Sequence, residues 1–149
     1  MTPLPIQELS ARVLSIALIS SNHAMRMGLN MILKAHPFIS LIDDIPMGAH
    51  AVDIVARGKP LVIIVDLELA DTDPLALIRK LRAAAADSHI LVLDGLNDEQ
   101  LTRGALAAGA EGVVLTIQPP AVLYAAIDSL CGFAPRSIDS QPAQSAIGL

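Results

Sequence analysis

Apolar residues gather in five short runs along the chain, separated by polar or helix-like stretches. In chain order the runs are VLSIALI (13–19), FISLID (38–43), LVIIVD (61–66), HILVLD (89–94) and GVVLT (112–116). The third and fourth runs are continuously apolar instead of alternating, which is typical of strands buried on both faces. The pattern therefore predicts five strands in a parallel sheet that is covered on both sides.

The stretches between these runs carry signals that begin and end helices. Asp73 before Pro74 places a capping carboxylate ahead of a proline in the first turn, which favours a helix start. Asn97 with Gln100 resembles a capping box. In chain order, the predicted helices follow Ser21 or Asn22 to about residue 35, cover 47–57, begin at Pro74, follow Asn97, and extend from Pro119–Pro120 to Gly132.

Strand and helix alternate five times, and this order defines the fold class. Alternation at this spacing indicates parallel strands joined by right-handed crossovers, with helices on both faces. We expect an α/β, doubly wound sheet of five parallel strands in the order 2-1-3-4-5, with five helices. The domain is predicted at 12–132, after an N-terminal extension (1–11) and before a flexible tail or linker (133–149).

The composition limits the classes of function and the cellular locations that the chain can have. The net charge is −5 and aromatic residues make up only 2% of the chain, which argues against a nucleic-acid-binding surface. A single cysteine, Cys131, excludes an internal disulfide. The apolar run at 13–19 is too short to span a bilayer, and Glu8 ahead of it is unlike a signal peptide. We expect a cytoplasmic protein without membrane contact.

Polar residues stand at the ends of four predicted strands. In open α/β sheets, ligands bind outside the carboxyl ends of the strands, where the strand order reverses. For the order 2-1-3-4-5 this point lies between the first and third strands. The polar residues at these ends are Ser21, Asn22, Asp66, Asp94 and Thr116. We predict that the fold brings them together in one site.

Four segments match, in order and spacing, the pattern of one family. They are NHAMRMGLNMIL (22–33), IVDLEL (64–69), HILVLDGL (89–96) and ALAAGAEGVVLT (105–116). With them the chain resembles the receiver domains of response regulators, which have the flavodoxin-like (CheY-like) fold, and among these the receivers of LuxR-type transcription factors. The resemblance covers about residues 12–132 and implies that Asp66 is the aspartate that accepts phosphate.

The chain departs from that family at its chemical positions. The family places two acidic residues after the first strand to hold Mg²⁺, and this chain has Ser21 and Asn22 there. The family's Thr or Ser at the end of the fourth strand is Asp94, and its Lys at the end of the fifth strand is Thr116. Of the usual positions, Asp66 alone keeps the family's residue.

These departures oppose phosphoryl transfer, which depends on positioning and on neutralising the charge of the transferring group. Mg²⁺ is usually held by one or two carboxylates with waters and phosphate oxygens, whereas Ser21 and Asn22 offer neutral oxygens. Thr116 removes a cation, and Asp94 adds a negative charge. We therefore expect no cofactor. Mg²⁺ would bind only in a functional site, shared by Asp66 and Asp94.

Other chemistries lack their motifs in this chain. There is no G-x-G-x-x-G after the first strand, no P-loop and no G-x-S-x-G. The four histidines lack metal-ligand spacing. Glu68 stands where an aspartyl-nucleophile hydrolase would need a second aspartate. These absences disfavour an enzyme.

The sequence predicts an atypical receiver, or pseudo-receiver, in which phosphorylation at Asp66 is absent or vestigial. It would act as a signalling and interaction module that forms a dimer or binds a protein partner through its last helices, and the family implies a histidine kinase as a further partner. Two alternatives stay open. One is a functional phosphoacceptor receiver of a two-component system, the N-terminal half of a LuxR-type DNA-binding regulator. The other is a small-molecule-sensing domain that uses the emptied pocket.

Overall fold

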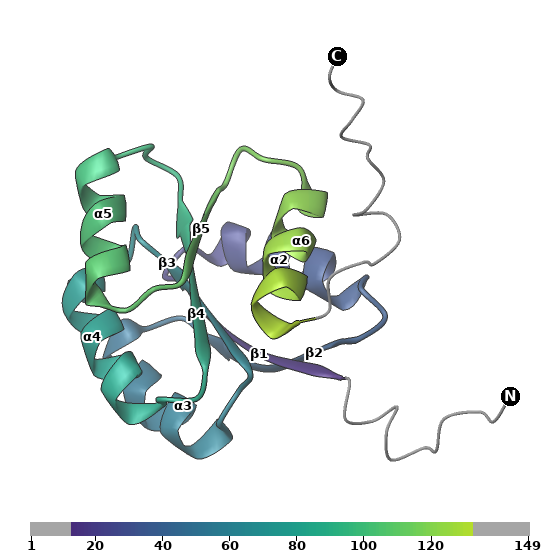
Figure 1. Ribbon diagram of the computed structural model, residues 1–149, viewed down its shortest axis with the longest axis horizontal. Helices are drawn as coiled ribbons and strands as arrows, with labels where there is room; N and C mark the ends of the chain where they lie inside the picture. Colours follow the sequence, from purple (N-terminus) through teal and green to yellow (C-terminus); the bar gives the residue numbers. More distant parts are fainter. Residues whose placement is uncertain (1–12, 133–149) are drawn as a thin grey trace, which may run out of the picture.

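The computed structural model describes residues 13–132, so the predicted N-terminal extension and C-terminal tail lie outside the described residues. The described part is a central sheet with helices on both faces (Figure 1). In chain order the elements are β1 (Leu14–Ile19), α2 (His23–Lys34), β2 (Ile39–Ile45), the 3₁₀ turn η1 (Gly48–His50), α3 (Ala51–Gly58), β3 (Val62–Asp66), α4 (Pro74–Ala84), β4 (His89–Asp94), α5 (Glu99–Ala108), β5 (Gly112–Leu115) and α6 (Pro120–Cys131).

The sheet has five strands in the order β2-β1-β3-β4-β5, and every neighbouring pair is parallel. Within residues 13–132, this confirms the predicted α/β fold, strand order and five α-helices. Sequence analysis predicted one helix over 47–57, where the structure has η1 followed by α3. Among the described helices, none is long and apolar enough to cross a membrane.

Two apolar cores fill the space between the sheet and the helices. On one face the sheet packs against α3, α4 and α5, and on the other against α2 and α6 (Figure 1). Successive strand residues point to opposite faces, so Ile63 belongs to the first core and Ile64 to the second. The central strand β3 is buried along its whole length, which explains its unbroken apolar run.

Helix ends follow the predicted signals at three places. The side chain of Asn22 caps α2 by accepting a hydrogen bond from the backbone N–H of Met25. Asp73 caps α4, and Pro74 is its first residue. Gly132 ends α6 in a left-handed conformation, with φ 75°. These ends confirm that local capping chemistry was readable in the sequence.

The predicted capping box at the start of α5 is wrong by one residue. Asp98, not Asn97, caps this helix, and its side chain accepts from the N–H of Leu101. Asn97 is left-handed, with φ 54°, and its N–H donates to the carboxylate of Asp94. Because its N–H is bound to the buried Asp94, Asn97 stays in the turn, and the helix begins one residue later than predicted.

The loop after β3 is fastened to η1 by Asp71. Its two carboxylate oxygens accept hydrogen bonds from the backbone N–H groups of Gly48 and Ala49, each at 3.0 Å. The bond from Ala49 contributes most to lowering the pKa of Asp71 below its ordinary value. A Cβ on Gly48 would lie 2.8 Å from the Thr72 hydroxyl, so the contact requires glycine there.

An ion-pair network joins α4 to the amino-terminal ends of β4 and β5, at the end of the strands opposite the loop that Asp71 fastens. The Arg82 guanidinium donates to Glu111 Oε2 at 2.8 Å and to the backbone oxygens of Ser88 and Gly109. His89 Nδ1 lies 2.8 Å from Glu111 Oε1. Burial raises the pKa of Glu111, but the hydrogen bonds from His89 and Arg82 lower it more, so the pKa lies below its ordinary value of 4.5.

We expect Glu111→Gln to lower the free energy of unfolding at pH 7 by about 1 kcal/mol, because it removes a partly exposed charged acceptor that binds both Arg82 and His89. A lowered folded-state pKa means that the carboxylate stabilises the fold above its unfolded pKa and that this contribution is lost as the pH falls through the folded pKa. The stability gap between the two proteins should therefore close below about pH 4.5. Urea denaturation between pH 3 and pH 7 measures it.

Glu99→Gln is the matched control for this network. Glu99 pairs with Arg103 at 3.6 Å, and both side chains are largely exposed. Exposed pairs of this kind contribute a few tenths of a kcal/mol. Equal losses in the two variants at pH 7 would contradict the assignment of the network.

Candidate functional site

Three polar residues are buried at the carboxyl ends of adjacent strands. They are Ser20 after β1, Asp66 at the end of β3 and Asp94 at the end of β4, with exposed fractions of 0%, 1% and 3%. Thr116 follows β5 and is exposed, and its N–H donates to the backbone oxygen of Asp94. We call these four residues the strand-end cluster. It lies at the carboxyl ends of the strands, where open α/β sheets bind their ligands.

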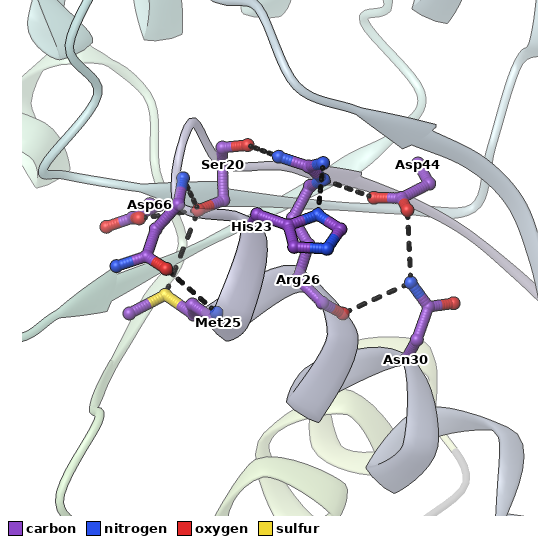
Figure 2. Close-up of polar contacts among 8 residues, drawn as sticks. Ser20, His23, Met25, Arg26, Asn30, Asp44 and Asp66 are labelled. Atoms are coloured by element: carbon purple, nitrogen blue, oxygen red, sulfur yellow. Dashed lines mark hydrogen bonds and ion pairs between the residues drawn. The ribbon is translucent and has the colours of Figure 1, made fainter.

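Both carboxylate oxygens of Asp66 already have partners within the chain. Oδ2 accepts a hydrogen bond of 2.8 Å from the Ser20 hydroxyl (Figure 2). Oδ1 accepts one of 2.9 Å from the N–H of Glu68. The Ser20 oxygen in turn accepts from the N–H of Asn22. A buried carboxylate needs such donors, because an unpaired one is costly away from water. Asp66 is thus held by neutral groups.

Sequence analysis placed Ser21 and Asn22 in the acidic pocket and missed Ser20. In the structure the Ser21 hydroxyl accepts from the N–H of Ala70, in the loop after β3, and the Asn22 side chain caps α2. Ser20 is the residue of this turn that contacts Asp66. The sequence did contain one signal for this. An Asn that caps a helix uses its side chain on that helix, so the residue that contacts Asp66 is expected earlier in the turn, nearer the strand.

The Asp94 carboxylate is engaged by the loop and helix that follow it. Oδ1 accepts from the N–H groups of Leu96 and Asn97, each at 2.9 Å. Oδ2 accepts from the hydroxyl of Thr102 on α5, also at 2.9 Å. Where the family carries a hydroxyl donor, this chain therefore has an acceptor that organises the β4–α5 loop.

A third carboxylate, which sequence analysis did not assign to the site, lies over the cluster. Gly95 follows Asp94, and a Cβ at this position would collide with Glu68 Oε2 and lie 3.1 Å from the Thr116 hydroxyl. The Glu68 side chain therefore crosses from the β3 end to the β4 and β5 ends. This approach is possible because residue 95 is glycine. Glu68 adds negative charge where an incoming phosphoryl group would also be negative.

The turn between β1 and α2 is fixed from its other side by Arg26. Its guanidinium donates to the backbone oxygen of Ser20 at 3.0 Å, and its Nε lies 3.1 Å from Asp44 Oδ1 (Figure 2). Asn30 bridges the backbone oxygen of Arg26 and the other Asp44 oxygen. This local network positions Ser20 against Asp66 without using an acidic residue from the turn itself.

The residues of the cluster do not fit a magnesium ion. Within residues 13–132 no group of three or more His, Cys, Asp or Glu side chains is arranged to hold a metal. Ser20 and Ser21 supply neutral hydroxyls, and the Asp94 oxygens are directed to their own loop. Mg²⁺ prefers an octahedral shell of oxygens in which carboxylates supply the charge.

A family model described as the response regulator receiver domain matches residues 16–128. The chain belongs to this family. Among curated proteins, the receiver domain is 26% identical over 113 residues to the nitrate/nitrite response regulator NarL of Escherichia coli, covering 76% of this chain and 52% of NarL. It is 27% identical over 115 residues to the transcriptional regulatory protein LiaR of Bacillus subtilis, covering 77% and 54%.

Solved structures share the fold of this receiver domain. A two-component response regulator of the LuxR family from Aurantimonas sp. SI85-9A1 superposes with a TM-score of 0.74 at 20% identity, covering 91% of this chain and 99% of that one. The isolated receiver domain of RcsB from Salmonella enterica gives 0.72 at 18% identity, covering 85% and 96%. The chain spans about half the length of the curated relatives it matches.

Proposed function

We propose that this receiver domain signals without phosphorylation of Asp66, as part of a LuxR-type transcriptional regulator. The observation that carries the proposal is the closed hydrogen bonding of Asp66, whose two oxygens are bound by the Ser20 hydroxyl and the Glu68 N–H. In this arrangement neutral donors take the place of a metal ion. The relatives named above are response regulators and transcriptional regulators, which supports a regulatory role.

The charges around Asp66 support this proposal. Phosphoryl transfer to a carboxylate depends on cations or donors that neutralise the transferring group. Here Asp94 and Glu68 add negative charge beside the site, and Thr116 supplies a hydroxyl in place of a lysine. Each of these changes acts against a phosphoryl group on Asp66, and their electrostatic effects have the same sign.

The output of such a domain would be protein interaction. We propose that α6 and the elements beside it form the surface for a dimer or for a protein partner in the cytoplasm, and that DNA is bound by a separate domain. A histidine kinase is then not required for signalling, although the family pairs receivers with kinases. Asp66 would serve the fold by anchoring Ser20, not by carrying phosphate.

We expect the chain to remain unmodified when incubated with acetyl phosphate and Mg²⁺, because its site lacks both the metal carboxylates and the cation. Intact mass spectrometry would detect the added phosphoryl group, and Asp66→Asn is the control for the site of any addition. An authentic phosphoaccepting receiver incubated in parallel verifies the reagents. Phosphate on the unaltered chain that is absent from Asp66→Asn would overturn the proposal and favour a functional phosphoacceptor.

A further inference from the structure

A groove of about 410 Å³ is lined by residues of α2, β5 and the start of α6. The helices α2 and α6 cover the face of the sheet opposite α3, α4 and α5 (Figure 1). Its floor includes the core side chains of Leu93, Val114 and Leu123, and Leu29 lines its wall on α2. The volume lies within the range of small-molecule sites, which are concave and mostly apolar. The phosphorylation chemistry of the family does not account for this groove, which adjoins α6 on the surface proposed above for protein contacts.

α2 carries a glycine at its middle, where the helix borders the groove. Gly28 lines the groove, and a Cβ built on it would have nothing within 4 Å. Glycine inside a helix costs about 1 kcal/mol relative to alanine, and no positive φ or close backbone approach requires it here. The residue therefore lowers helix stability without a backbone reason, and the space beside it is open to a larger side chain.

The lining of the groove is uncharged. None of its residues is Asp, Glu, Lys, Arg or His, and its polar side chains are Asn22, Thr116 and Gln118, near the strand-end cluster. An ionised ligand would lose its hydration in such a site without gaining a partner. A neutral ligand with an apolar body and a hydrogen-bonding group fits this pattern.

The groove adjoins the phosphoacceptor position through Met25. This side chain lines the groove, and its sulfur lies 3.9 Å from the hydroxyl of Ser20, which donates to Asp66 (Figure 2). Methionine is flexible and adapts its shape to what it contacts. An occupant of the groove would thus press on the same turn that holds the strand-end cluster.

We propose that this groove binds a neutral, mainly apolar small molecule, whose hydrogen-bonding group faces Asn22 and Thr116. The inference goes beyond the proposed function and does not depend on whether Asp66 accepts phosphate. It rests on the volume, the uncharged lining and the open space at Gly28.

The test uses the neutral fluorescent probe N-phenyl-1-naphthylamine with the full chain. We expect saturable binding at one site, about tenfold weaker binding to Gly28→Leu because the leucine fills the groove, and nearly unchanged binding to Gly28→Ala. Both substitutions improve helix propensity, so both variants should be at least as stable as the unaltered chain in urea. Ala107→Leu, on the exposed side of α5, adds the same side chain elsewhere and should bind the probe normally.

Amide chemical shifts locate the bound probe. Changes concentrated at Gly28, Leu115 and Thr116 support the proposal. Binding to Gly28→Leu as tight as to the unaltered chain, or shifts centred on another face, would overturn it. Failure of the probe to bind would also overturn the proposal. One cause of such a failure would be a second copy of the chain that covers this face, and sedimentation would then show a dimer that Gly28→Leu weakens.

Discussion

A variant with the four substitutions Ser20→Asp, Ser21→Asp, Asp94→Thr and Thr116→Lys should bind the phosphate mimic beryllofluoride when Mg²⁺ is present. The unaltered chain should not bind it. The first two restore carboxylates at the turn that contacts Asp66 and its loop. Asn22 is left in place because it caps α2. The other two replace an acceptor by a hydroxyl donor and restore a cation.

The size of this effect follows from linkage. A ligand present at 100 times its dissociation constant stabilises the folded state by about 2.7 kcal/mol. For a domain of this size that corresponds to a rise of about 5–10 °C in melting temperature. Without Mg²⁺, the variant should be less stable than the unaltered chain, because Ser20→Asp places a second buried carboxylate against Asp66.

The control adds Asp66→Asn to the four substitutions and should lose beryllofluoride binding. Thermal unfolding with Mg²⁺ alone, with beryllofluoride alone and with both separates metal binding from mimic binding. A folded variant that binds Mg²⁺ but not beryllofluoride would show that these four positions are not what closes the site. Glu68, which lies over the cluster beside Gly95, would then be the next residue to replace.

Asp94→Ala should lower the free energy of unfolding by about 2 kcal/mol, although Asp94 lies at a position where the family uses a switch residue. The substitution removes the acceptor for the N–H groups of Leu96 and Asn97 and for the Thr102 hydroxyl. Groups that lose a partner in a partly buried loop incur a desolvation cost of about 1 kcal/mol or more. Urea denaturation measures the difference.

Two control variants separate the role of the Asp94 carboxylate from that of the helix cap beside it. Asp94→Asn retains an oxygen for the two N–H groups and an amide for Thr102, so it should cost less than about 1 kcal/mol. Asp98→Ala removes only the helix cap of the same element and should cost about 1 kcal/mol. Equal stability of Asp94→Ala and Asp94→Asn would mean that the carboxylate does not organise the loop.

The fold was predictable because its signals are local. Continuous apolar runs indicate strands buried on both faces, and the structure buries β3 completely. Asp73 with Pro74 and Asn22 marked helix starts that the structure confirms. The misplaced start of α5 shows the limit of such signals, because the N–H of Asn97 donates to the buried Asp94, which holds Asn97 in the turn and leaves the cap to Asp98.

The site was predictable in its location and only partly in its members. The carboxyl ends of parallel strands meet at one edge, so Asp66 and Asp94 were assigned to the same region from the order of elements alone. Ser20 was missed because three neutral polar residues follow one another there, and the cap signal of Asn22 still leaves the choice between Ser20 and Ser21 open. Glu68 was considered only as a departure from a hydrolase pattern, since its reach to Gly95 crosses two loops.

By itself, the sequence determined the five strands, five helices and strand order, and it located an aspartate at the end of the third strand without the usual chemical partners. The strands and helices depend on residue periodicity and on capping groups a few positions apart, whereas the strand order and the missing chemical partners follow from the resemblance to receiver domains. The tertiary structure alone decided that the Ser20 hydroxyl binds Asp66, that Asp94 serves its own loop, and that α2 and α6 leave a groove at Gly28. The first and the third depend on distances between segments far apart in the chain, which packing sets, and the second depends on how the loop after β4 folds back on Asp94.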